Sequence, residues 1–244
     1  MRNRWFCREG AAVLAGNYQY LLVDLDDTIL DWKMSERTVL CDVIFRRYGR
    51  TLTEEEIARY GDINAACWKQ LERREITKEE LTIKRFQAFL ESLSIAEDEE
   101  GLRALNRSYM ERNSQLAFVI PGAERACREL AKRYRLILIT NGTDWVQRGR
   151  LAKIPFAECF CGVVISDEVG CNKPAPEFFR GVTAITGDTD VSRYLVIGDS
   201  QSSDIAFGRA IGADTCWVRT RGDGQSGEST YTVSSLAEAA TLLL

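Results

Sequence analysis

The 244-residue sequence contains no histidine, no long apolar run and no excess of basic residues. Without histidine, the protein cannot use a Ser-His-Asp triad, a histidine general base or a histidine-ligated zinc site. No stretch approaches the roughly 18 apolar residues of a membrane span, so we expect no membrane partner. A net charge of −4 and a pI near 5.2 argue against a surface for nucleic-acid polymers.

The eight cysteines include no Cys-x-x-Cys pair. Cys159 and Cys161 form a Cys-x-Cys, which is compatible with a metal or redox pair, but a chain without a secretory signal is expected to keep its thiols reduced. Residues 1–17 are interpreted as an accessory N-terminal extension, because Glu9 interrupts the approach to a short apolar run. We therefore expect a cytoplasmic protein, with monomer and homodimer both left open.

An abrupt change from apolar to acidic residues occurs between positions 20 and 28. Residues 20–23 are apolar or aromatic, and so short a run is typical of a strand buried on both faces. Asp24 and Asp26 follow at i and i+2, so in extended chain both side chains point the same way. Because neighbouring carboxylates repel each other, the pair indicates a divalent-metal site; two acidic residues that begin a solvated loop are the alternative.

The segment 34–116 has helical patterns without an intervening strand. Capping boxes at Thr53-x-x-Glu56 and Thr77-x-x-Glu80 predict two helix starts. Four amphipathic helices in succession predict a small all-α bundle.

Strand and helix patterns alternate after this segment, which predicts βαβ units and a parallel sheet. The predicted strands are Leu136–Ile139, Val163–Ile165, Tyr194–Ile197 and Thr215–Val218. The strand at 20–23 belongs to the same sheet, so the helical bundle is inserted into an α/β domain. We expect a Rossmann-like core domain of residues 18–33 and 117–244 and an all-α cap domain of residues 34–116.

Polar residues follow three of the other predicted strands as they follow the first. They are Thr140-Asn141-Gly142, Lys173-Pro174, Asp199-Ser200 and, beyond these, Asp204. Each alone is compatible with a turn, a loop or a helix cap. Ligands of open parallel sheets bind at the carboxyl ends of the strands, so together these residues predict a ligand site at one sheet edge.

The sequence resembles the haloacid dehalogenase superfamily over residues 18–244. The matching motifs are residues 24–28, residues 139–142, Lys173-Pro174, and residues 198–200 with Asp204. The inserted helices resemble the C1 helical cap of that superfamily. Residues 63–68, 75–81, 85–86 and 214–217 are similar to the pyrimidine 5′-nucleotidase branch; residues 1–17 and Cys171-Asn172 depart from it.

Phosphoryl-transfer chemistry suggests a role for each motif. Mg²⁺ prefers oxygen ligands and suits Asp24 and Asp199, and the resemblance implies that the main-chain carbonyl of Asp26 is a third ligand. Asp24 is expected to attack phosphorus and form an aspartyl-phosphate. Asp26 is expected to protonate the leaving oxygen and then to activate water.

Four further positions complete the predicted site. Thr140, the amide of Asn141 and Lys173 are expected to hold the phosphate oxygens. Asp204 is expected to orient Lys173 or a metal-bound water rather than to bind the metal.

The predicted function is a Mg²⁺-dependent phosphomonoesterase whose substrate is a small phosphorylated metabolite, a pyrimidine nucleoside 5′-monophosphate. Candidate substrate contacts are Trp32, Asn64, Trp68 and Arg85, each of which also suits packing inside the cap. A sugar-phosphate phosphatase, a phosphomutase and a binding protein on a retired hydrolase scaffold are the alternatives. A carbon–halogen dehalogenase would need the nucleophile, but neither Asp26 as an acid nor Asp199 as a metal ligand.

Overall fold

The computed structural model describes residues 17–219 and 228–244. Of the predicted N-terminal extension, residues 1–16 lie outside the described residues. None of the helices in these two ranges combines the length and the apolar composition of a membrane span.

A six-stranded sheet with the order β3-β2-β1-β4-β5-β6 forms the centre of the molecule, and all its neighbouring strands are parallel. The strands are β1 (Tyr20–Asp24), β2 (Arg135–Thr140), β3 (Phe160–Ile165), β4 (Tyr194–Gly198), β5 (Asp214–Val218) and β6 (Tyr231–Val233). The predicted α/β fold with a Rossmann-like parallel sheet is thus confirmed. Strand β6, which has only three residues, was not predicted.

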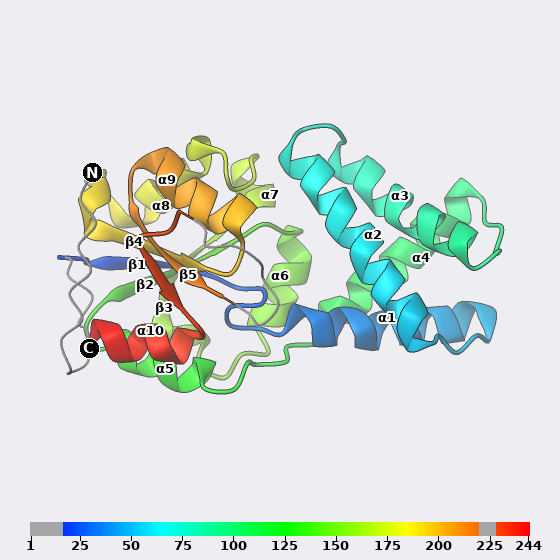
Figure 1. Cartoon of the computed structure of the whole chain (residues 1–244), viewed down its shortest axis with the longest axis horizontal. Helices are drawn as coiled ribbons and strands as arrows, with labels where there is room; N and C mark the ends of the chain where they lie inside the picture. The colour runs from blue at the N-terminus through cyan, green and yellow to red at the C-terminus, as the bar shows by residue number, and fades with distance from the viewer. Residues whose placement is uncertain (1–16, 220–227) are drawn as a thin grey trace.

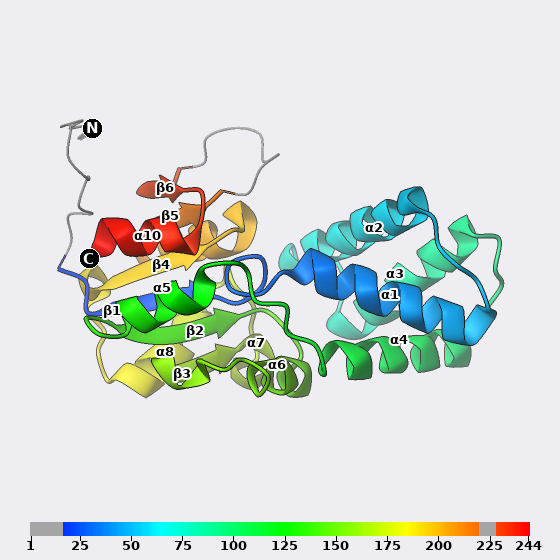
Figure 2. The ribbon, with the colours of Figure 1, turned by 90° about the horizontal axis from the view of Figure 1, so that it is seen from below.

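Alternate residues of the central strand face the two sides of the sheet. Leu21 and Val23 of β1 pack into one apolar cluster, and Tyr20 and Leu22 pack into another. Helices α5 (Ala123–Leu130) and α10 (Leu236–Leu243) cover the first face, and α8 (Phe179–Thr186) and α9 (Ala206–Ile211) cover the second (Figure 1). Figure 2 shows the molecule from the side of α5 and α10. A strand covered on both sides needs apolar residues throughout, which explains the run at 20–23.

Between β1 and β2 the chain builds a separate group of helices. These are α1 (Trp32–Tyr48), α2 (Glu54–Glu72), α3 (Lys78–Ser92) and α4 (Glu99–Asn113). Both predicted capping boxes are present, at Thr53 and at Thr77. An aromatic cluster holds the group together. The ring centre of Tyr60 lies within about 6 Å of the ring centres of Phe86, Phe89 and Tyr109.

The helical group, called the cap below, lies beyond the carboxyl ends of the strands, so that β1 runs directly toward it (Figure 1). Helix α1 begins at Trp32, two residues before the predicted cap boundary. The loops that follow the strands consequently lie between the sheet and the cap.

Candidate active site

The ammonium group of Lys173 lies between two carboxylates at the end of β1. Its Nζ is 2.6 Å from Oδ1 of Asp24 and 2.7 Å from Oδ1 of Asp204, and it also donates to the carbonyl of Ile139 at 3.1 Å. Lys173 and Asp204 are each only 1% exposed. Burial lowers the pKa of Lys173, but the two carboxylates raise it more, so it lies above its ordinary value and the group is charged.

Asn141 fixes the loop that carries this lysine. Its Oδ1 accepts from the amide of Lys173 at 2.8 Å, and its Nδ2 donates to the carbonyl of Lys173 at 2.8 Å and to Oγ of Ser203 at 3.2 Å. The side chain of Asn141 is therefore engaged in joining two loops. Only its main-chain amide, which the sequence analysis named, is left to meet a phosphate.

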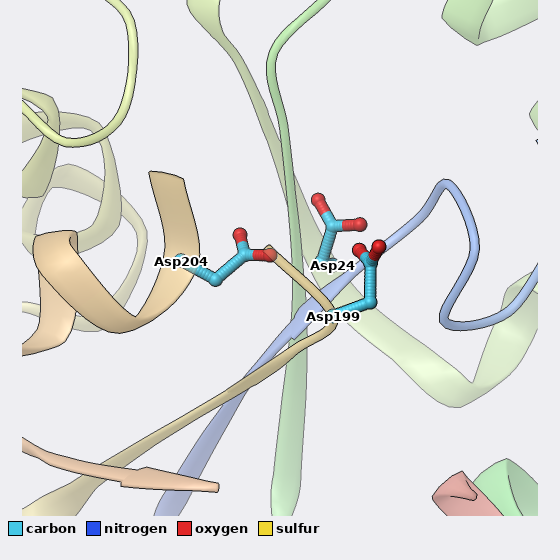
Figure 3. Close-up of side chains that lie close together, drawn as sticks. All are labelled: Asp24, Asp199 and Asp204. Atoms are coloured by element: carbon cyan, nitrogen blue, oxygen red, sulfur yellow. The ribbon is translucent and has the colours of Figure 1, made fainter. Parts of the chain in front are cut away.

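Three carboxylates from different segments meet beside Lys173 (Figure 3). Asp24 ends β1, Asp199 follows β4, and Asp204 lies in the next helical turn, with oxygens within 4.8 Å of one another. Burial is the largest cause that raises the pKa of Asp24, and the nearby Asp204 raises it further, whereas Lys173 opposes them. Burial, together with the smaller effects of the charges on Asp24 and Asp204, raises the pKa of Asp199 to about 9.

These oxygens fit a hard divalent cation, which would offset their mutual repulsion. Both oxygens of Asp204 are already used, since Oδ1 accepts from Lys173 and Oδ2 from the amide of Ser200 at 3.1 Å. Within the described part of the chain, the carboxylate of Asp199 accepts no hydrogen bond. Asp24 and Asp199 are thus the better placed to hold an ion, and Asp204 to hold Lys173.

The carboxylate of Asp26 points into a different environment from that of Asp24. Its Oδ2 accepts from Nε2 of Gln147 at 3.0 Å, and its Oδ1 lies 2.6 Å from Nη1 of Arg150. The same Gln147 Nε2 donates to Oγ1 of Thr140 at 2.8 Å. Helix α6 (Asp144–Leu151) therefore links the predicted acid to the predicted phosphate-binding hydroxyl.

A cavity of about 220 Å³ separates the strand ends from the cap. Its core side includes Asp24, Asp26, Thr140, Asn141, Lys173, Asp199 and Asp204. Its cap side includes Trp32, Trp68, Glu72, Lys78, Leu81, Thr82, Arg85 and Met110. The cavity thus joins a charged floor to a roof of both apolar and charged side chains.

Three of the four predicted substrate contacts, Trp32, Trp68 and Arg85, line this cavity. Asn64 is buried behind the cavity wall. Its Nδ2 donates to Glu36 at 2.6 Å, and its Oδ1 accepts from Nη1 of Arg85 at 3.3 Å. In this arrangement Asn64 orients Arg85, and we no longer expect it to touch a substrate.

Residues that the sequence analysis did not select also belong to the site. Gln147 and Arg150 lie one helical turn apart, but the turn pattern alone does not say which face of α6 meets Asp26. Lys78 reaches from the first turn of α3 to the carbonyl of Gly142 at 2.9 Å. Such a contact between distant segments depends on where the cap sits.

Comparison with known proteins gives a consistent result. A family model described as haloacid dehalogenase-like hydrolase matches residues 18–212. Pyrimidine 5′-nucleotidase YjjG of Escherichia coli is 29% identical, covering 93% of this chain and 98% of YjjG. Pyrimidine 5′-nucleotidase PynA of Streptococcus pneumoniae is 31% identical, covering 82% of this chain and 83% of PynA. The solved structure of the HAD-hydrolase YfnB from Bacillus subtilis, bound to magnesium, is 29% identical, with a TM-score of 0.85 over 93% of this chain and 98% of that one.

Proposed function

The chain belongs to the haloacid dehalogenase-like hydrolase family, and we propose that it is a Mg²⁺-dependent phosphomonoesterase that acts through an aspartyl-phosphate on Asp24. The observation that carries this proposal is the contrast between two carboxylates only two residues apart. Asp24 lies against Lys173 in the acidic cluster, whereas Asp26 is held by Gln147 and Arg150. Two carboxylates in unlike surroundings suit two roles, nucleophile and proton donor.

Each chemical step can be assigned to a residue of this chain. Asp24 attacks phosphorus while the bond to the leaving oxygen breaks, and Asp26 gives that oxygen a proton, which releases the alcohol. Water then attacks the phosphorus and gives a proton to Asp26, and cleavage of the bond to Asp24 releases phosphate. Both side chains return to their starting states.

The phosphate is held by groups around Asp24. The hydroxyl of Thr140 accepts a hydrogen bond from Gln147, so its own proton remains available for a phosphate oxygen. The buried ammonium of Lys173 supplies positive charge from below. Asp24 and Asp199 would hold Mg²⁺, which supplies charge neutralisation between the carboxylates and the phosphate dianion.

We further propose that the substrate is a pyrimidine nucleoside 5′-monophosphate. The names of YjjG and PynA support this assignment. The cavity of about 220 Å³ suits a small molecule rather than a polymer. Trp32 and Trp68 in its lining provide flat surfaces for a planar ring.

The test compares wild-type protein with Asp24→Asn, using 4-nitrophenyl phosphate and UMP with Mg²⁺. We expect wild-type turnover that stops with EDTA and returns with Mg²⁺, poor replacement by Ca²⁺ because of its looser coordination, and no turnover by the variant. Asp62→Asn, at an exposed cap position, is the matched control and should behave as wild type. Wild-type rates in folded Asp24→Asn would refute the nucleophile, and full activity after exhaustive chelation would refute the metal.

A further inference from the structure

We propose that Gln147 and Arg150 are positioning residues that fix the carboxylate of Asp26 for proton transfer to the leaving oxygen. The inference rests on the proposed phosphatase function and deepens it, because it states which phosphate esters the site is built for. These are esters whose alcohol is a poor leaving group, such as the 5′-oxygen of a nucleoside.

The two side chains hold Asp26 from two directions. Gln147 donates to Oδ2 at 3.0 Å, and Nη1 of Arg150 lies 2.6 Å from Oδ1. The same Nη1 donates to Oε1 of Gln147 at 2.9 Å, so the two holding groups also fix each other. Rotation of the Asp26 carboxylate would break contacts at both of its oxygens.

Arg150 is fully buried, and its placement is unusual for a charged side chain. Its guanidinium lies 5.2 Å from the ring centre of Trp32, and Nε and Nη2 have no hydrogen-bond partner within residues 17–219 and 228–244. The contact with Asp26 is its single ion pair in those ranges. An apolar side chain would fill such a site at less cost in free energy, which argues that Arg150 serves Asp26.

Gly142 gives Gln147 room to reach the acid. A Cβ atom at this glycine would lie 2.7 Å from Cγ of Gln147, closer than real contacts allow. The third residue of the Thr140-Asn141-Gly142 motif thus shapes the path of the Gln147 side chain. The positioning device therefore includes the loop after β2 as well as α6.

A comparison of two esters with different leaving groups separates acid positioning from a purely structural role, because loss of structure would affect both esters alike. A nucleoside alkoxide leaves only when it is protonated, whereas 4-nitrophenolate is stable enough to leave without a proton. The quantity to measure is kcat/KM, because it covers the steps up to release of the alcohol and excludes the later attack of water. Loss of acid positioning should lower kcat/KM for UMP by much more than for 4-nitrophenyl phosphate, whereas any effect of Gln147 through Thr140 on phosphate binding is common to both esters.

The experiment measures kcat/KM for both esters in wild type, Gln147→Met, Arg150→Met and Gly142→Ala. General acid catalysis contributes about 10²- to 10⁴-fold, so we expect the UMP to 4-nitrophenyl phosphate ratio to fall about 10²-fold in Gln147→Met and Arg150→Met. Gly142→Ala should lower the ratio less. Arg148→Met is the matched control, since Arg148 lies on the same helix but pairs with Asp144 and Glu168.

Each outcome bears on the proposal. An unchanged ratio in folded Gln147→Met, or an equal loss for both esters, would overturn the positioning role even if Arg150→Met failed to fold. A fall in the ratio in Arg148→Met as large as in Gln147→Met would also overturn it. Wild-type protein that hydrolyses neither ester would instead refute the proposed function itself.

Discussion

Lys173 is the residue on which the charge balance of the site depends. It is fully buried between Asp24 and Asp204. A buried cation with two buried carboxylates is stable only while all partners are present, because each unpaired charge would have lost its water without gaining a counter-charge. Lys173 therefore supports the fold as well as the chemistry.

We expect Lys173→Met to lower the free energy of unfolding of the metal-free protein by about 3–5 kcal/mol, the usual cost of breaking a buried ion pair from one side. Urea unfolding in EDTA measures this change. The double variant Lys173→Met/Asp204→Asn should recover part of the loss, because it removes one of the orphaned carboxylates. Lys132→Met, which breaks an exposed pair with Glu129, should change the stability by less than about 1 kcal/mol; an equal effect of the two single variants would contradict the argument.

Two buried thiols give the protein a pH-dependent stability. Burial raises the pKa of Cys127 and of Cys216 from 9.0 to about 12. Between pH 9 and 12 the unfolded chain has lost these protons while the folded chain retains them. The free energy of unfolding therefore falls as the pH rises through that window.

The prediction is that Cys127→Ala/Cys216→Ala loses less stability than wild type between pH 8 and pH 10. The difference should be about 1.4 kcal/mol for each thiol at pH 10. Urea unfolding at the two pH values measures it. Cys161→Ala, at an exposed position, should keep the wild-type dependence; parallel behaviour of wild type and the double variant would contradict the assignment.

The position of a single residue can be predicted from the sequence where that residue ends a strand. Asp24, Thr140 and Asp199 each follow an apolar run, and parallel strands bring their carboxyl ends to one edge. Gln147 and Arg150 were not predicted, because a short polar helix leaves open which of its faces meets the sheet. Among single residues, the sequence thus places those that strand geometry alone brings to one edge of the sheet.

Among the elements, helices with explicit start signals were the easiest to predict. The capping boxes at Thr53 and Thr77 are present in the structure, each with reciprocal hydrogen bonds to the glutamate three residues later. Strand β6 escaped prediction because Tyr231–Val233 is too short to show a period of two. Its place in the sheet comes from pairing with β5, which is a tertiary contact.

The first turn of α3 joins the cap to the segments that follow β2 and β3. Lys78 donates to the carbonyl of Gly142 and also pairs with Asp167 of α7 (Ser166–Val169). We expect Lys78→Met to lower kcat/KM by about 10-fold, because a charged hydrogen bond of about 1.5 kcal/mol that holds the cap over the loop is lost. Steady-state kinetics with UMP tests this, and Lys84→Met, exposed on the same helix, is the control. Unchanged kinetics in Lys78→Met would show that this contact does not contribute.

For the molecule as a whole, the cavity proposed for the substrate lies where the cap and core meet. Lys78 of the cap donates to the carbonyl of Gly142 across this boundary, and residues of both units line the cavity. The order of motifs predicted an inserted helical unit, but no local pattern fixes how two units are placed against each other. This is why Trp32, Asn64, Trp68 and Arg85 were equal candidates from the sequence, although the structure places only Asn64 behind the cavity wall.

The size of the cavity leads to a prediction about the base. Beneath the cap the cavity is about 220 Å³, and Leu81 and Met110 form part of its apolar lining. A slot that admits one ring and excludes water before phosphoryl transfer should reject a two-ring base by steric overlap. We expect kcat/KM for UMP and dTMP to exceed that for AMP and GMP by about 10-fold or more, consistent with the discrimination that apolar pockets achieve.

The variant Met110→Ala separates steric selection from other causes. Shortening this side chain enlarges the cavity, so the preference for UMP over AMP should shrink, while turnover of 4-nitrophenyl phosphate changes little. Glucose-6-phosphate, which lacks a planar ring, should be a poor substrate in both proteins. If purine nucleotides or the sugar phosphate turn over as fast as UMP in wild type, the pyrimidine assignment is wrong. The charged floor around Asp24 would then remain that of a phosphatase, whose selectivity must come from the cap residues in some other way.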